Sequence, residues 1–158
     1  MTAHFDVATF LRAHRAPILD RATAAVRGER LRHYEAAGAD EIAARVASLF
    51  DVVVQAAADR NLAAATAHAE AIASERHQSG HDLSEFQRAA NALEEQLWQA
   101  VLTDVPVDDR GYALGVVSTI LGAIKDRVAC IYVSSASATP VHTLRIDELF
   151  RGAAAGDA

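Results

Sequence analysis

The residues of this chain best suited to chemistry are its seven histidines, because an imidazole nitrogen can bind a metal ion or a haem iron. His77 and His81 are four residues apart, which is the spacing of two metal ligands on one helical face. Gly80 lies between them, and glycine commonly ends a helix, so the two rings are predicted on opposite sides of a helix break. No carboxylate-rich partner helix offers the Glu-x-x-His spacing of a di-iron site. The sequence therefore predicts no metal site.

Residues that could act as nucleophiles are also poorly placed for catalysis. Ser84 has the position of a helix cap, and the serines within 134–137 lie in a small, polar stretch. Cys130 lies in an apolar helix with no sequence cue for a thiolate. There is no glycine-rich phosphate loop. The sequence therefore predicts that the protein is not an enzyme.

The strongest structural signal is a corner between two helices within residues 75–98. Gly80 is predicted to end the first helix, with Arg76 in the last turn, where the helix dipole favours a cation. Asp82 and Glu85 have the three-residue spacing of a capping box at the start of the second helix. Beyond the corner, one apolar stripe faces a core: Phe86, Ala90, Leu93, Leu97 and Val101.

The same corner resembles a known family. Arg76 at a helix end, Gly80 and the helix start at Leu83-Ser84-Glu85 resemble the N-terminal sensor domain of RsbR-type stressosome proteins. The resemblance runs from about Pro17 to about Val133. It implies a helical, globin-like sensory domain that usually lacks haem, pairs as a homodimer and acts on a regulatory protein partner. A STAS domain normally follows this domain in the family, and here we expect a sensor module standing without it.

We expect no cofactor, but the globin-like resemblance leaves one alternative, a sensor that binds haem or a small ligand. A haem iron needs only one axial imidazole. His68 lies in the middle of a predicted helix among small alanines, where a flat cofactor could approach, and His77 or His81 could serve at the helix end. The simpler interpretation is a solvated histidine or one at the edge of the core. The sequence names neither the signal sensed nor the downstream partner.

Composition and periodicity predict an all-α, single globin-like helical domain of five or six main helices over residues 1–138. The hydrophobic fraction is 51%, but much of it is alanine and aromatic residues are only 6%, which favours helices over strands. At 139–158 we expect a linker and a short amphipathic tail segment. The aromatic residues Phe10, Phe50, Phe86 and Trp98 could line a ligand pocket, but we interpret them as core.

Capping and breaking residues predict where these helices begin and end. Asp6, Asp40 and Asp108 are expected as caps, and Pro17 as the first residue of a helix. The sequence Asp59-Arg60-Asn61 is expected to break a helix, and the last helix is expected to run from about Asp109 to Ser134.

This last helix carries two apolar faces. One has the spacing of a helix seam: Leu114, Val117, Leu121, Ile124, Val128 and Ile131. Val116, Ile120 and Ala123 form a second face, which we expect to be left uncovered. Gly115 and Gly122 would allow a partner helix to approach closely. We therefore predict a homodimer whose interface uses these five residues. The alternative is that this helix is the central core element, covered on both sides by its own chain.

Charge and cysteine content limit the partners and the compartment. The net charge is −6, and only Lys125 is a lysine among the 15 basic residues, so no basic stripe is available for nucleic acid or anionic membrane surfaces. A single cysteine excludes a disulfide framework and fits a reducing compartment. No apolar run of about 18 residues and no signal peptide is evident. We therefore expect a cytoplasmic protein.

Overall fold

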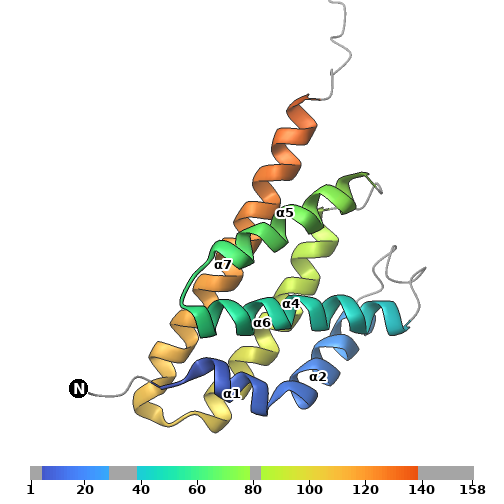
Figure 1. Cartoon of the computed structure of the whole chain (residues 1–158). Coiled ribbons are helices and arrows are strands. Elements are labelled where there is room, and N and C mark those ends of the chain that lie inside the picture. Colours follow the sequence, from blue (N-terminus) through green and yellow to red (C-terminus); the bar gives the residue numbers. More distant parts are fainter. Residues whose placement is uncertain (1–4, 29–38, 79–82, 139–158) are drawn as a thin grey trace, which may run out of the picture.

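The computed structural model describes residues 5–28, 39–78 and 83–138, and this part of the chain contains six helices and no strand (Figure 1). The helices are α1 (Val7–Ala13), α2 (Arg15–Gly28), α4 (Ala39–Asp59), α5 (Ala63–Gln78), α6 (Leu83–Asp104) and α7 (Val107–Ala138). The prediction of one all-α domain is confirmed. The predictions for Gly80, His81, Asp82 and the tail at 139–158 lie outside the described residues, and so does the side chain of His77.

Helix α1 begins where its cap predicts. The Asp6 carboxylate accepts hydrogen bonds from the Thr9 backbone N–H (3.0 Å) and the Thr9 hydroxyl (2.7 Å). Helix α2 already begins at Arg15, so the prediction that Pro17 opens it was wrong. The reason is that the His14 carbonyl accepts a helical hydrogen bond from the Ile18 N–H (3.2 Å), which places Pro17 inside the first turn, where no N–H is needed.

Helix α4 carries one buried stripe at helical spacing and ends at the predicted break. Five residues of the stripe are buried: Ile42, Val46, Leu49, Val53 and Ala56. Asp40 lies in the first turn rather than at the cap, where its charge still favours the helix dipole. After Asp59 the backbone of Arg60 turns into the left-handed region (φ 49°), and the Asn61 side chain accepts from the Ala63 N–H (2.9 Å) at the start of α5.

Helix α5 has small side chains on its inner face and packs closely against α7. Ala65, Ala69 and Ala73 on its inner face are fully buried. Because alanine projects only a methyl group, the two helix backbones can approach each other.

Helices α6 and α7 form an antiparallel pair joined at Pro106. Lys125 Nζ of α7 bonds Glu94 Oε2 (2.6 Å) and Asn91 Oδ1 (3.1 Å) of α6. The Pro106 carbonyl accepts from the Asp109 N–H (2.9 Å), so α7 starts at Val107 and Asp108 lies in its first turn instead of capping it.

Helix α7 is longer than predicted. It runs to Ala138, past the expected end at Ser134. Alanine and serine do not break a helix, and the Ser137 hydroxyl donates to the Val133 carbonyl (2.9 Å) within it. Figure 1 shows this end of α7 extending beyond the other helices.

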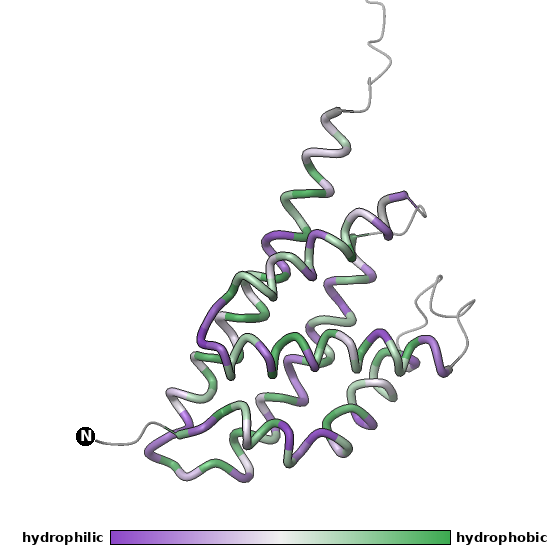
Figure 2. The backbone as a smooth tube through the Cα atoms, in the orientation of Figure 1, coloured by the Kyte–Doolittle hydropathy of each residue, from purple (hydrophilic) through white to green (hydrophobic). Residues whose placement is uncertain are grey.

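All six described helices contribute buried residues to one core. Figure 2 shows apolar and polar residues alternating along the helices, as expected when each helix has one buried face. On α7 the predicted seam residues Val117, Leu121, Ile124 and Val128 are fully buried. The seam therefore holds α7 to its own chain.

Candidate functional site

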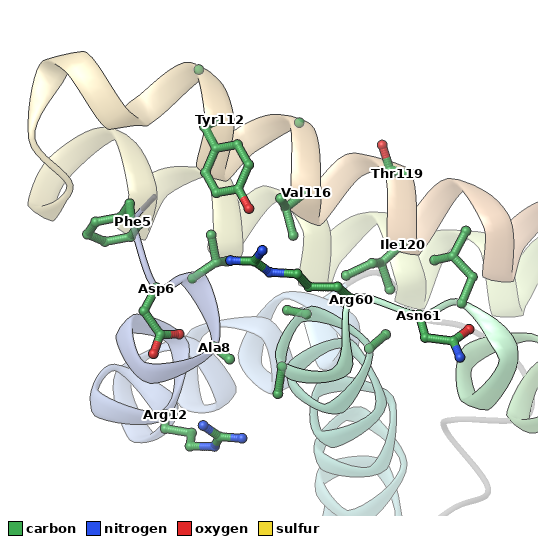
Figure 3. A pocket seen from close by; sticks show the side chains of 17 residues that line it. Phe5, Asp6, Ala8, Arg12, Arg60, Asn61, Tyr112, Val116, Thr119 and Ile120 are labelled. Carbon is green, nitrogen blue, oxygen red and sulfur yellow. The ribbon is translucent and has the colours of Figure 1, made fainter. Parts of the chain in front are cut away.

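A cavity of about 770 Å³ opens between α1, the junction of α4 with α5, and α7 (Figure 3). Its volume is in the range of small-ligand sites. The α1 side contributes Phe5, Asp6, Val7, Ala8 and Arg12, the junction contributes Ala56, Ala57, Ala58, Arg60, Asn61 and Leu62, and α7 contributes Gly111, Tyr112, Gly115, Val116, Thr119 and Ile120.

The local structure of each wall explains why the cavity is not filled. Three consecutive alanines at 56–58 give the end of α4 only methyl groups. Gly111 and Gly115 give α7 no side chain, and a Cβ built at either position would meet no atom within 4 Å. The break after α4 turns the chain at Arg60, so that its side chain, and not another apolar one, lies in the cavity.

The cavity lining combines apolar side chains with charged and polar groups. Figure 3 shows the Arg60 side chain reaching across it toward the Tyr112 hydroxyl, whereas Arg12 lies further out and is turned away from Arg60. Asp6 is engaged in its cap, and the hydrogen bonds from the Thr9 N–H and hydroxyl hold the pKa of this carboxyl below its usual value. Within the described ranges, Arg60 has no ion pair or hydrogen bond.

The sequence did not predict this cavity, although it singled out several residues that line it. Gly115, Val116 and Ile120 were predicted at a dimer interface, and here they form part of the α7 wall. Ile120 is only 4% exposed, so the expectation that its face is left uncovered was wrong for this residue. The reason is that α4 and α5 both pack on α7.

Gly122 and Ala123 of the predicted interface do not line the cavity. A Cβ at Gly122 would meet no atom within 4 Å, and Ala123 is half-buried. Both residues therefore keep accessible surface.

Three of the four aromatic residues that we interpreted as core are buried: Phe10, Phe50 and Phe86. Trp98 is 43% exposed, so this interpretation was wrong for it. Its indole N–H donates to the Ser118 hydroxyl (3.1 Å), and this bond links α6 to α7 at the surface. An aromatic ring with a polar N–H is suited to such an edge position.

His68, the central histidine of the haem alternative, lies in a shallow groove of about 440 Å³ between α4 and α5. Its Nε2 atom is covered by protein and has no hydrogen-bond partner among the described residues, and burial lowers the pKa of the ring. An axial haem ligand must present a nitrogen to the iron. In this conformation Nε2 is not accessible to one.

Neither a metal site nor a membrane span is found in the part of the chain that the structure describes. Nowhere in 5–28, 39–78 and 83–138 do three or more His, Cys, Asp or Glu side chains gather as metal ligands would. None of the helices seen in these ranges combines the length and the apolar character needed to cross a bilayer. Cys130 is a free, exposed thiol.

Comparison with known proteins gives one match. The family model described as the RsbT co-antagonist protein rsbRD N-terminal domain matches residues 16–137. The match covers α4, α5 and α6 completely, nearly all of α2 and α7, and none of α1. No curated protein and no solved structure matches the chain.

Proposed function

The chain belongs to the family of RsbT co-antagonist protein RsbRD N-terminal domains, and we propose that it is a non-catalytic sensory or regulatory domain that acts through protein–protein contacts. The observation that carries this proposal is the family match over 16–137, which includes most of the helical domain. The family is one of regulatory modules, and its name denotes joint action with other proteins on RsbT. The partners of this chain are therefore proposed to be cytoplasmic stressosome proteins.

Binding to purified partners tests this role. We expect the chain to associate with RsbT, or with the other stressosome proteins of its own organism, in a surface-immobilised binding assay. A variant with a polar change on the exposed apolar edge of α6, Leu102→Ser, serves to locate the contact, because this side chain is 46% exposed and its replacement leaves the core intact. Failure of the folded wild-type chain to bind any of these proteins would contradict the proposal.

The chain is also proposed to be a homodimer that uses the outer surface of α7. Glycine inside a helix is less favourable than alanine by about 0.5–1 kcal/mol. No described atom within 4 Å requires glycine at 115 or 122, since a Cβ at either position would meet open space. Close approach of a second α7 would supply the missing reason. The half-buried residues Val116 and Ala123 lie beside this surface.

Light scattering tests the dimer. We expect a dimer mass for the wild-type protein at micromolar concentration and a monomer mass for Gly122→Leu. Gly28→Leu is the matched control, because this residue also has open space around it but lies at the end of α2. Circular dichroism would confirm that both variants are folded. A monomeric wild-type protein would refute the proposal, and so would a Gly122→Leu protein that is folded and still dimeric.

A second candidate function is a globin-like sensor that binds a small ligand, and the cavity beside Arg60 favours it. The haem form of this candidate has less support, because His68 Nε2 is covered. We expect the purified protein to be colourless. A Soret band that disappears on replacing His68, His77 or His81 by alanine would instead assign haem.

A further inference from the structure

We propose that the cavity between α1, the α4–α5 junction and α7 binds a small carboxylate with an apolar body, and that Arg60 holds its charged end. This inference deepens the proposed sensory role, since it names the chemical class of ligand that the domain would detect. It rests on the side chains of the cavity, not on the family match, which begins at residue 16 and leaves out the α1 wall.

Arg60 differs from other arginines of the domain in having no acceptor among the described residues. Other arginines of the domain use nearby acceptors: Arg15 bonds Asp51 (3.1 Å), and Arg21 bonds the Gln96 side chain (3.1 Å). Arg60 has no such acceptor among the described residues, although the chain carries an excess of carboxylates, with a net charge of −6. Its guanidinium instead lies inside the cavity (Figure 3). A cation so placed can accept an anionic partner from outside the chain.

The charged residues that line the cavity are two arginines and one aspartate. Asp6 is the one carboxylate among the lining residues, and its two oxygens already accept from Thr9. Arg12 at the outer edge adds a second positive charge. A single negative charge on the ligand is therefore matched by Arg60. A phosphate dianion fits less well, because Arg12 is turned away and Asp6 would repel the second charge (Figure 3).

Part of the cavity is lined by apolar side chains. Ala56, Ala57, Leu62, Val116 and Ile120 present only carbon atoms to the cavity. An apolar surface gains free energy when another apolar group covers it, so these side chains favour a ligand with an apolar body. The ring of Tyr112, which points toward Arg60 in Figure 3, adds apolar surface next to the charged end. The site thus has a cationic end at Arg60 and an apolar end.

Titration of the wild-type protein with matched ligand pairs tests the proposal. The probes are benzoate and hexanoate, with benzamide and hexanamide as neutral molecules of the same shape, and binding is measured by calorimetry and by shifts in amide NMR spectra. We expect at least one carboxylate to bind about tenfold more tightly than its amide, since a charge-assisted hydrogen bond to Arg60 is lost in the amide. Sodium chloride at equal ionic strength controls for screening.

Two variants locate the site. Arg60→Gln should weaken carboxylate binding about tenfold or more and leave amide binding unchanged. Val116→Trp should block both, because the Val116 side chain points into the cavity (Figure 3). Arg88→Gln is the control, since this exposed arginine of α6 does not line the cavity. Circular dichroism confirms folding.

The proposal is overturned if neither carboxylate binds at millimolar concentration. It is also overturned if carboxylate and amide bind equally, or if folded Arg60→Gln or Val116→Trp binds the carboxylate like wild type. These results are independent of binding to RsbT. Failure of the ligand site and failure of the proposed regulatory function can therefore be told apart.

Discussion

Replacing Gly115 and Gly122 of α7 by alanine tests whether the outer surface of this helix is open within one chain and covered in a dimer. At both positions an added Cβ would have no neighbouring atom within 4 Å. Alanine inside a helix is favoured over glycine by about 0.5–1 kcal/mol. The two positions are roughly 10 Å apart along the helix axis, so the two gains should add. The free energy of unfolding of an isolated chain should therefore rise by about 1–2 kcal/mol, which raises Tm by about 2–8 °C in a domain of this size.

In the dimer the same methyl groups would have the opposite effect, because they would separate two closely packed helices. The assay is scanning calorimetry over a series of protein concentrations. Dimerisation stabilises the folded state by mass action, so Tm of the wild-type protein should rise with concentration. At the lowest protein concentration, the Tm of the double variant should be higher than that of wild type. As the concentration is raised, its Tm should increase less than that of wild type. Gly28→Ala, at the end of α2, should keep the concentration dependence of wild type.

Three outcomes would refute this reasoning. A double variant less stable than wild type at the lowest concentration would show that the space at Gly115 and Gly122 is not open. A more stable variant with unchanged concentration dependence would place the dimer contact elsewhere. A wild-type Tm that does not depend on protein concentration, together with a monomer mass in light scattering, would show that the protein is not a dimer.

Three further predictions concern the fold. Leu121→Ala should lower the free energy of unfolding by about 2–5 kcal/mol in urea denaturation, because this side chain is fully buried. Leu102→Ala, at a half-exposed position, should lower it far less. Equal losses in the two variants would contradict the assignment of Leu121 to the core. Asp6→Ala should lower Tm, because it removes the cap of α1. The folded-state pKa of Asp6 is lowered, so the stabilising contribution of the cap is fully present above the usual aspartate pKa. This contribution is lost as pH falls through the folded-state pKa. The Tm difference between Asp6→Ala and wild type should therefore close in acid, and a constant difference would argue against the cap. Burial lowers the folded-state pKa of His68, so the unfolded chain binds its proton first, and stability should fall as pH drops below the ordinary histidine pKa of about 6.5. His68→Gln should lessen this fall in a pH series of urea titrations, and an identical pH dependence would contradict the buried neutral ring.

The features that the sequence predicted correctly are those fixed by nearby residues. The cap at Asp6 needs only Thr9, and the break at Arg60 and Asn61 needs only its own backbone and the first turn of α5. The stripe of α4 follows from helical period alone. The small errors at Asp40 and Asp108 have a local cause too, because an acidic residue favours both a cap and a first turn.

The cavity could not be predicted, because its walls come from three segments far apart in the sequence. Residues 5–12, 56–62 and 111–120 meet only after α1, α4 and α7 have packed. The burial of Ile120 was missed for the same reason. Periodicity shows that α7 has two apolar faces, but it does not show that α4, α5 and α6 all pack on this one helix. Such contacts follow from tertiary packing and have no local pattern.

The length of α7 has a mechanical consequence. This helix of 32 residues is about 48 Å long, and one continuous rod joins the cavity wall at Tyr112 to the protruding end at Ala138. A rigid rod converts a small tilt at one end into a larger displacement at the other. A tilt of about 5° at Ile120 would move the far end by roughly 2 Å, which is the size of helix shift that repacks protein interfaces. One end of this rod therefore borders the cavity, and its last residues, up to Ala138, extend beyond the other helices (Figure 1).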